Sequence, residues 1–502
     1  MNLRYMEFIN KKYINAGSAF CKTITAWLCE VKKTFFCLFL IHIAAVLAIF
    51  RSNTYYIDDM GRACFGYQGW DNFSRYLSNF LSGFLHADSY LSDISPLPQI
   101  VALAILSLAD VIVICIVTGK TKVSFWHVAA VLPLGLCPYF LECISYKYDA
   151  PYMALSIFAS VVPFLIFGFQ EKYGIFFLGS VLGILMMCTT YQASSGIFPM
   201  LVIFICIRRW NEADEQKKIG KFLLVSILAY GTGIAIFRIF IMEPVESYVS
   251  SSIPPVRELV PLVIRNLNQY LWYIRSDYPK MWKVLIFMLC VLFVFAMGYK
   301  SKRKKFAACL LAICALAAMG LMSFGIYPLL EAPLYAPRAM YGAGVFLAVI
   351  GVYVTSMDLA LMKIPAVVLG WVFFVFTFTY GNALHMQNEY TDFRMVAVIE
   401  ELNGLDEFAS NEVKNVQIAG TIGYAPALTG VMERYGILKR LVPVTFAEGW
   451  MWAGYKFYNY YGLKNVVSES TVDLRTCNLP VIKDTMYFTI RGYENDLLVE
   501  LK

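Results

Sequence analysis

Long apolar segments alternate with short polar segments over the first three quarters of the chain. A helix needs about 20 mostly apolar residues to cross a hydrocarbon core of about 30 Å. About eleven segments meet this requirement, at 34–50, 96–117, 124–142, 152–169, 174–189, 194–207, 222–241, 281–298, 306–325, 340–357 and 364–383. Because 174–189 and 194–207 are short, they could instead form one re-entrant hairpin, which would leave about nine spans. The pattern predicts an all-α polytopic membrane protein.

The pattern changes beyond about residue 384, where charged residues occur regularly. The runs 415–420 and 486–490 are rich in β-forming residues and predict strands. About 118 residues are enough for a small domain with its own core. We therefore expect three parts: a cytoplasmic N-terminal segment 1–33, a transmembrane domain 34–383 whose first outer loop is 51–95, and a small C-terminal α/β domain 384–502 on the outer side.

The composition agrees with this class. Of 502 residues, 59% are hydrophobic and 15% are charged, and the mean hydropathy is +0.60. A soluble core of this length could not bury so much apolar surface. The formal charge of +7 comes from basic runs such as Arg208-Arg209 and 300–305, which fall in loops on one side. Cytoplasmic loops carry such an excess of Lys and Arg, so the charge gives no indication of a nucleic-acid partner.

The first outer loop holds two adjacent carboxylates, Asp58 and Asp59, directly after the first span and on the non-cytoplasmic side. Carboxylates in such a place are suited to acid–base chemistry. Neighbouring residues do not point the same way in regular structure, so we expect the two to have different roles. Apolar residues at helical spacing over 73–84 predict an amphipathic helix in the plane of the interface.

Other outer loops add polar candidates. Lys147 and Asp149 lie in the second outer loop, where Asp149 either caps the next helix or belongs to a site. Tyr191 and Gln192 lie in the following outer loop. Arg338, at the mouth of the tenth span, either binds a lipid phosphate with its guanidinium fork or is a plain interfacial anchor.

Few ionisable residues lie inside the predicted spans, and Asp110 and Arg238 are the exceptions that stand out. An ion-driven transporter is expected to place several such groups near the membrane midplane. The charged groups gather at the outer surface instead. This distribution favours a membrane-embedded enzyme over a pore or a pump.

Two outer loops carry a resemblance to known enzymes. The run Asn53-Thr-Tyr-Tyr-Ile-Asp-Asp-Met-Gly-Arg62 follows the first span and precedes an amphipathic aromatic helix. This arrangement, with many spans and an outward C-terminal region, is similar to that of type C glycosyltransferases, which use polyprenyl-phosphate sugars. Together with Tyr146-Lys-Tyr-Asp-Ala-Pro151, it resembles the serotype-converting O-antigen glucosyltransferases of the Gtr type.

The resemblance implies a multi-pass protein of the bacterial inner membrane whose active site faces the periplasm. It implies undecaprenyl phosphate-glucose as donor and a lipid-linked O-antigen sugar as acceptor. In such enzymes a loop carboxylate near the first span is the general base, and one displacement inverts the anomeric centre. Asp58 would then be the base, with Asp59 as the alternative, and the other carboxylate would orient the base, the sugar or a metal. Asp149 would be a further acidic site residue. The expected substrate-binding residues are Arg62, Lys147, Tyr191, Gln192 and Arg338.

The sequence allows alternatives for the cofactor, the partners and the reaction. The pattern requires no cofactor, but three carboxylates could hold a divalent ion such as Mg²⁺ or Mn²⁺. Besides the bilayer, a flippase and a donor-synthesising glucosyltransferase are expected partners. The alternatives are a related type C transferase for another sugar and a lipid or polysaccharide transporter.

Overall fold

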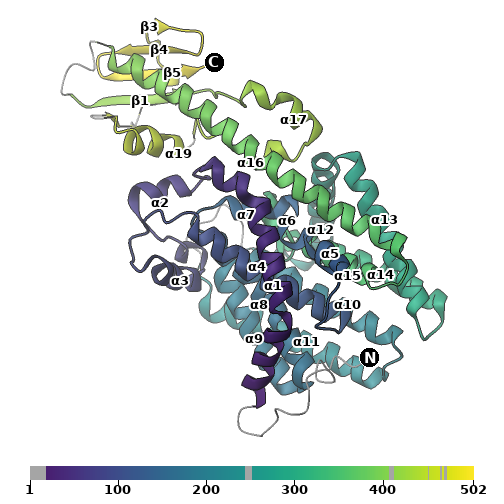
Figure 1. Ribbon diagram of the computed structural model, residues 1–502. Coiled ribbons are helices and arrows are strands. Elements are labelled where there is room, and N and C mark those ends of the chain that lie inside the picture. The colour runs from purple at the N-terminus through teal and green to yellow at the C-terminus, as the bar shows by residue number, and fades with distance from the viewer. Residues whose placement is uncertain (1–18, 244–251, 406–411, 450, 464–465, 468–471) are drawn as a thin grey trace.

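The computed structural model describes residues 19–243, 252–405, 412–449, 451–463, 466–467 and 472–502 (Figure 1). A bundle of helices makes up most of the molecule. A small sheet lies at one end of this bundle, beside the C-terminal half of one long helix.

Nine helices among these residues are long and apolar enough to cross a membrane. They include or coincide with α1 (Ala19–Ser52), α4 (Leu97–Thr118), α8 (Ala150–Gln170), α9 (Tyr173–Thr190), α10 (Ile197–Asn211), α11 (Gln216–Ile236), α13 (Lys280–Lys300), α14 (Lys305–Met322) and α16 (Ala360–Asn403). The two segments that could have formed a hairpin are separate spans of 18 and 20 residues. At 1.5 Å per residue each reaches about 27 to 30 Å, the length of a full crossing.

The two remaining predicted segments do not form long continuous helices. The one predicted at 124–142 is broken into α5 (Phe125–Val131), α6 (Pro133–Leu136) and α7 (Pro138–Ser145), with a bend of 59° before α7. Proline begins both later pieces, and its missing N–H interrupts the helical hydrogen bonds. Helix α15 (Gly342–Thr355) is apolar but has only 14 residues. Against the eleven predicted segments, the described residues thus contain nine candidate spans, or ten if the bent pair is one span.

Helix α1 packs against α16 and α4 inside the bundle. A Cβ at Gly381 of α16 would lie 2.5 Å from the backbone of Ala48, so glycine lets these two helices approach closely. His42 Nε2 of α1 and Asp110 Oδ2 of α4 lie 2.7 Å apart, and both side chains are fully buried. The acid that the sequence places inside a span therefore joins two helices.

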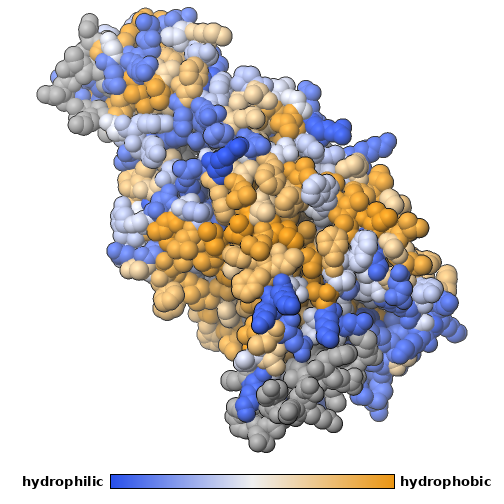
Figure 2. All heavy atoms as spheres, in the orientation of Figure 1, coloured by the Kyte–Doolittle hydropathy of each residue, from blue (hydrophilic) through white to orange (hydrophobic). Residues whose placement is uncertain are grey.

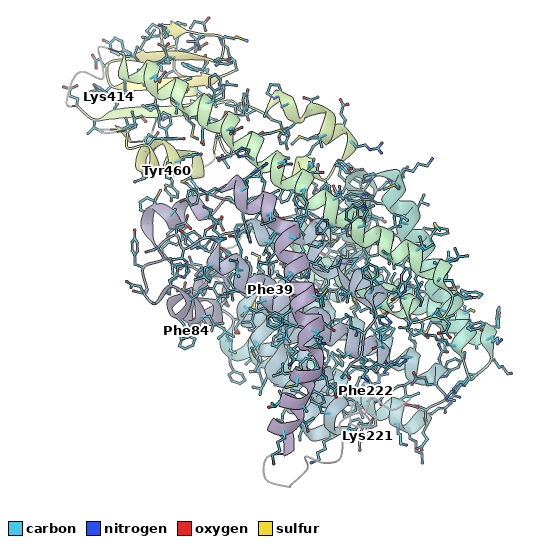
Figure 3. All side chains as sticks on the ribbon, in the orientation of Figure 1. Phe39, Phe84, Lys221, Phe222, Lys414 and Tyr460 are labelled. Carbon is cyan, nitrogen blue, oxygen red and sulfur yellow. The ribbon has the colours of Figure 1, made fainter. Side chains whose placement is uncertain are left out.

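Polar and apolar side chains divide the molecule into zones. Figure 2 shows an apolar band around the middle, with polar side chains toward the C-terminal sheet and toward the opposite end. Lys414 lies at the first end and Lys221 at the second (Figure 3). The N–H of Lys302 donates to the carbonyl of Asn211, so two of the basic loops meet. The loops thus gather at two ends of an apolar body, as expected for a membrane protein.

Several helices lie outside the candidate spans at the end that carries the sheet, among them α2 (Asp59–Phe65), α3 (Tyr76–His86) and α12 (Val256–Asp277). The amphipathic helix expected over 73–84 is confirmed as α3, although it begins only at Tyr76 because Asp71–Phe73 forms a separate 3-10 turn. Tyr76, Phe80 and Phe84 are exposed on it, whereas Ser78 and Ser82 are buried. Phe84 points away from the protein (Figure 3). This orientation suits a helix that lies in the membrane interface.

Helix α16 joins the bundle to the C-terminal sheet without interruption. Its 44 residues span about 66 Å at 1.5 Å per residue, roughly twice the thickness of a hydrocarbon core. The domain boundary expected at 384 therefore falls inside a continuous helix.

The C-terminal sheet has five strands in the order β2-β1-β5-β4-β3. They are β1 (Lys414–Ala419), β2 (Val466–Val467), β3 (Val481–Asp484), β4 (Phe488–Tyr493) and β5 (Asp496–Leu501). Strand β1 pairs in parallel with β2 and β5, while β3, β4 and β5 are antiparallel. Strands β1 and β4 confirm the two that the sequence predicts, and the α/β character of this part is as expected.

The region beyond α16 divides between two hydrophobic cores. Val416, Ile490 and Val499 of the sheet pack with the end of α16 in a core of their own. The stretch with α17 (Thr429–Arg434) and α18 (Leu438–Leu441) packs instead into the core of the helix bundle. The short helix α19 (Met451–Gly454) lies between them in the chain. The C-terminal part is therefore built into the membrane domain rather than resting on it.

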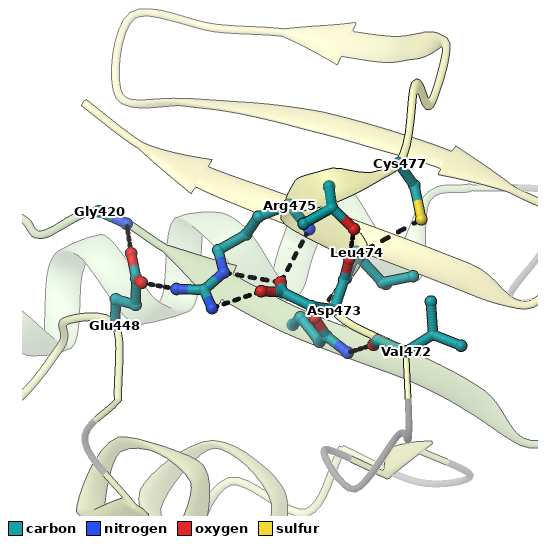
Figure 4. A network of polar contacts seen from close by, with 9 residues as sticks. Gly420, Glu448, Val472, Asp473, Leu474, Arg475 and Cys477 are labelled. Atoms are coloured by element: carbon teal, nitrogen blue, oxygen red, sulfur yellow. Dashed lines mark hydrogen bonds and ion pairs between the residues drawn. The ribbon is translucent and has the colours of Figure 1, made fainter.

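A polar network holds one surface loop against the sheet (Figure 4). Arg475 forms ion pairs with Asp473 and Glu448, and Glu448 accepts a hydrogen bond from the N–H of Gly420 at the end of β1. These side chains are about half exposed, so the pairs contribute little to stability.

Candidate active site

The candidate site begins with a sharp turn after α1. Ile57 has a φ of 47°, a left-handed conformation that is unfavourable for a β-branched residue. Such a residue costs about 1 to 3 kcal/mol and persists only where the surrounding structure holds it. The turn starts α2 immediately, so that Asp58 and Asp59 point in different directions.

Asp59 points into the protein. It is fully buried, and its Oδ2 accepts hydrogen bonds from the N–H of Tyr56 at 3.0 Å and of Lys147 at 2.9 Å. Burial raises the pKa of this carboxyl, although the two N–H groups oppose the rise. Asp59 thus joins the first outer loop to the second, and its geometry is that of a positioning residue.

Asp58 is partly exposed and makes no side-chain hydrogen bond to any residue that the structure describes. Burial raises its pKa, and the charge of Asp149 acts in the same direction. The positive charges of Arg62, Arg338 and Arg75 oppose the rise, so three arginines lie within electrostatic reach. A carboxylate with a raised pKa and free oxygens is suited to accept a proton.

Arg62 and Asp149 form a buried ion pair, with 2.7 Å between Arg62 Nη1 and Asp149 Oδ2. The other oxygen of Asp149 accepts from Trp70 Nε1 at 2.5 Å, and the guanidinium of Arg62 lies 4.3 Å from the centre of the Trp70 ring. Asp149 makes no capping hydrogen bond with its side chain at the start of α8. Asp149 thus occupies the N-cap position of α8 without capping it through its side chain, because both of its carboxylate oxygens are occupied by Arg62 and Trp70.

Lys147 and Arg338 are also paired within the protein. Lys147 Nζ lies 2.7 Å from Asn53 Oδ1 and 3.2 Å from Asp93 Oδ2. Arg338 forms an ion pair with Glu142, which also accepts the N–H of Arg338 at 2.6 Å. Glu142 is buried in α7, the last piece of the broken third segment. Because the sequence pattern puts it at a span end, it is not predicted as a site residue.

Tyr191 and Gln192 meet Arg75, another residue that the sequence does not single out. Arg75 Nε donates to Gln192 Oε1 at 3.0 Å, and its guanidinium lies 4.6 Å from the centre of the Tyr191 ring. Tyr191 is buried, and its hydroxyl has no partner among the described residues. Only the approach of α3 to the end of α9 brings these residues together, so no local sequence signal marks Arg75.

The three carboxylates do not form a ligand set for a divalent ion. Asp149 is occupied by Arg62 and Trp70, while Asp59 points away from Asp58 into the protein. Among the described residues, no group of three or more His, Cys, Asp or Glu side chains is arranged to hold a metal. The arrangement at Asp58 instead combines a free carboxylate with nearby cations, which suits acid–base catalysis on an anionic substrate.

Residues 47–354 match the family described as Glucosyl transferase GtrII. The chain belongs to this family. A relative from Salmonella phage P22, an uncharacterized 55.3 kDa protein in the gtrB 5′ region, is 23% identical over 420 residues, which cover 80% of this chain and 84% of the relative. No solved structure matches the chain.

The resemblance to Gtr-type glucosyltransferases is thereby confirmed, and the protein is a membrane-embedded glycosyltransferase. The match to the GtrII family includes Asp58, Asp59, Asp149 and Arg338, and it ends before α16. All the outer loops that build the candidate site therefore lie within the family's shared region.

We predict that glycosyl transfer becomes faster as pH rises through the pKa of Asp58, because a base must be deprotonated. The raised pKa should put the acidic limb of kcat/KM above the ordinary aspartate value of about 3.9. Transfer by the purified protein between about pH 4 and 8 measures this limb. Circular dichroism at each pH separates titration from unfolding, and a rate that stays constant down to about pH 4 would contradict the raised pKa.

Proposed function

We propose that this protein transfers glucose from undecaprenyl phosphate-glucose to a sugar of a lipid-linked O-antigen repeat, on the periplasmic face of the bacterial inner membrane. Asp58 carries the proposal, because it is a partly exposed carboxylate with a raised pKa near three arginines, just beyond the end of a span. The orientation is supported by the basic loops at the opposite end, which suit the cytoplasm.

The proposed reaction is a single inverting displacement. The acceptor hydroxyl oxygen bonds to the anomeric carbon of glucose as the bond from that carbon to the phosphate oxygen breaks. The hydroxyl proton goes to Asp58, and the electron pair of the broken bond goes to the leaving polyprenyl phosphate. A positioned carboxylate assists such a proton transfer, and nearby cations stabilise the charge that gathers on the phosphate.

The other acidic residues have positioning roles in this proposal. Asp59 fixes the turn before Asp58 through the N–H groups of Tyr56 and Lys147. Asp149 holds Arg62 in an ion pair, and the positive charge of Arg62 opposes the rise in the pKa of Asp58. Supply of the donor at the periplasmic face requires a separate enzyme that makes it and a flippase that moves it across the membrane.

The test is transfer in vitro with the purified protein in lipid nanodiscs. Undecaprenyl phosphate carrying radiolabelled glucose should label lipid-linked O-antigen, and each modified repeat should gain the mass of one hexose. Undecaprenyl phosphate-galactose is the control donor, because it differs from the proposed donor only in its sugar. Equal transfer from it would favour the related transferase for another sugar. Movement of the lipid-linked glycan across vesicles without sugar transfer would overturn the proposal in favour of a transporter.

A further inference from the structure

We propose that Arg75, together with Tyr191 and Gln192, binds the phosphate of the lipid-linked sugar donor. This inference rests on the proposed function, because it concerns the donor of that reaction. It replaces the expectation that Arg338 or Lys147 meets the phosphate, and it assigns a role to a residue that the sequence does not mark.

The other cations near Asp58 are already paired with carboxylates. Arg62 lies 2.7 Å from Asp149, Lys147 lies 3.2 Å from Asp93, and Arg338 is paired with Glu142. A cation that already has a carboxylate partner offers little net charge to a phosphate, and all three of these cations are largely buried. Separating it from that partner would leave a buried charge uncompensated.

Arg75 differs from these cations. Its Nε donates to Gln192, and no carboxylate lies within ion-pair distance of it in the described part of the chain. The guanidinium lies 4.6 Å from the ring centre of Tyr191 and 5.0 Å from that of Phe73. Both terminal nitrogens are thus left to donate as a fork, the geometry that matches two phosphate oxygens.

Tyr191, whose ring lies beside the guanidinium of Arg75, carries a buried hydroxyl. Tyr191 is 2% exposed, and its hydroxyl has no hydrogen-bond partner among the described residues. A buried hydroxyl without a partner is unfavourable, and a phosphate oxygen beside Arg75 would accept its hydrogen bond. Gln192 is fixed by its own donation to the carbonyl of Phe73 at 3.1 Å, which holds Arg75 in place.

The depth of this group fits a lipid phosphate. Tyr191 and Gln192 follow α9 directly, and Ser74, next to Arg75, accepts a hydrogen bond from the N–H of Glu243, which lies just beyond the π-helix Phe237–Ile241 that continues α11. Arg75 therefore lies at the level where two spans end. Along α9, going back from Tyr191 toward the middle of the helix, apolar side chains are exposed at four-residue spacing. They are Met186, Leu182 and Leu178. A phosphate at Arg75 could keep its isoprenoid chain in the hydrocarbon, while its sugar reaches toward Asp58.

The chemistry also requires a cation at this place. Breaking the bond between glucose and phosphate converts a phosphodiester into a phosphomonoester, which carries more negative charge. Arg75 would stabilise that charge as it develops. Its charge acts on Asp58 as well, so the base and the phosphate site lie in one electrostatic neighbourhood.

The test compares Arg75→Gln with wild type in nanodiscs. We expect kcat/KM for the polyprenyl-phosphate donor to fall about 10²-fold, KM for the acceptor to stay unchanged, and product inhibition by undecaprenyl phosphate to weaken. Arg75→Lys should restore part of the activity, since it keeps the charge without the fork. Arg257→Gln is the matched control, because Arg257 is an exposed arginine of α12 and should keep wild-type kinetics.

Binding of undecaprenyl phosphate, measured by native mass spectrometry, separates this inference from the proposed function. Weaker binding by Arg75→Gln with an unchanged unfolding temperature supports the inference even if the natural acceptor is another glycan. Equal binding and equal inhibition in Arg75→Gln and wild type would overturn it, while glucose transfer by wild type would still support the function. If inorganic phosphate or phosphatidylglycerol vesicles competed as strongly as undecaprenyl phosphate does, the site would be a general anion site. That result would also overturn the inference.

Discussion

Replacing Asp58 with asparagine should lower the rate of glucosyl transfer by about 10²- to 10⁴-fold, the contribution of a positioned general base. Asparagine has nearly the same shape, but it cannot accept the hydroxyl proton. Asp58 makes no side-chain hydrogen bond to the described residues, so the variant should keep the wild-type unfolding temperature. Single-turnover transfer of radiolabelled glucose in nanodiscs measures the chemical step directly.

The matched control is Asp71→Asn. Asp71 is an exposed acid of the same outer loop, and its loss should leave the rate unchanged. Wild-type turnover by Asp58→Asn would remove Asp58 from the chemistry and with it the main support for the mechanism.

Asp59 provides a second comparison, which separates the two carboxylates. Asp59→Asn keeps an oxygen that can accept from Tyr56 and Lys147, so it should retain more activity than Asp58→Asn. Asp59→Ala leaves two buried N–H groups without an acceptor, at about 1 to 3 kcal/mol each, and should lower the unfolding temperature. An inactive Asp59→Asn beside an active Asp58→Asn would reverse the assignment.

Breaking the ion pair between Arg62 and Asp149 should have the largest effect on stability. Arg62→Met leaves a buried carboxylate without its cation, since the two side chains are only 5% and 8% exposed. Removing one partner of such a pair costs about 3 to 5 kcal/mol. The unfolding temperature in nanodiscs should therefore fall by several degrees, and the transfer rate should fall with it because the turn around Asp58 loosens.

The double variant Arg62→Met with Asp149→Leu distinguishes pairing from simple packing. If the pair is the cause, removing both charges should cost less than the sum of the two single changes. Glu215→Gln is the control, because it breaks an exposed pair with Lys218 at the opposite end of the bundle and should leave stability unchanged. Additive effects at Arg62 and Asp149 would contradict the coupling.

Much of the fold follows from sequence periodicity. Nine apolar segments correspond to candidate spans, and the amphipathic helix α3 and strands β1 and β4 lie where the pattern puts them. The errors have physical causes. Two prolines break the segment predicted at 124–142, and α16 runs past residue 384 because a helix need not end where its surroundings change from lipid to water.

The candidate site could be predicted only in outline. The position of Asp58 and Asp59 directly after a span marks the first outer loop as a place for chemistry, and the basic loops indicate which end is cytoplasmic. These are local properties of the chain. They do not show which carboxylate is free, or which cations are already paired.

The sequence by itself determined the membrane class, the approximate spans, the resemblance to the Gtr-type enzymes and the loop that holds the aspartates. Tertiary structure decided the pairing of side chains: Arg62 with Asp149 across 87 residues, Arg75 with Gln192 across 117, and Arg338 with Glu142 across 196. Apolar periodicity is encoded within each segment, whereas these pairs depend on which helix ends meet when the segments pack. That packing buries Asp59 and occupies Asp149, while among the described residues it leaves Asp58 without a side-chain hydrogen bond and Arg75 without a carboxylate partner.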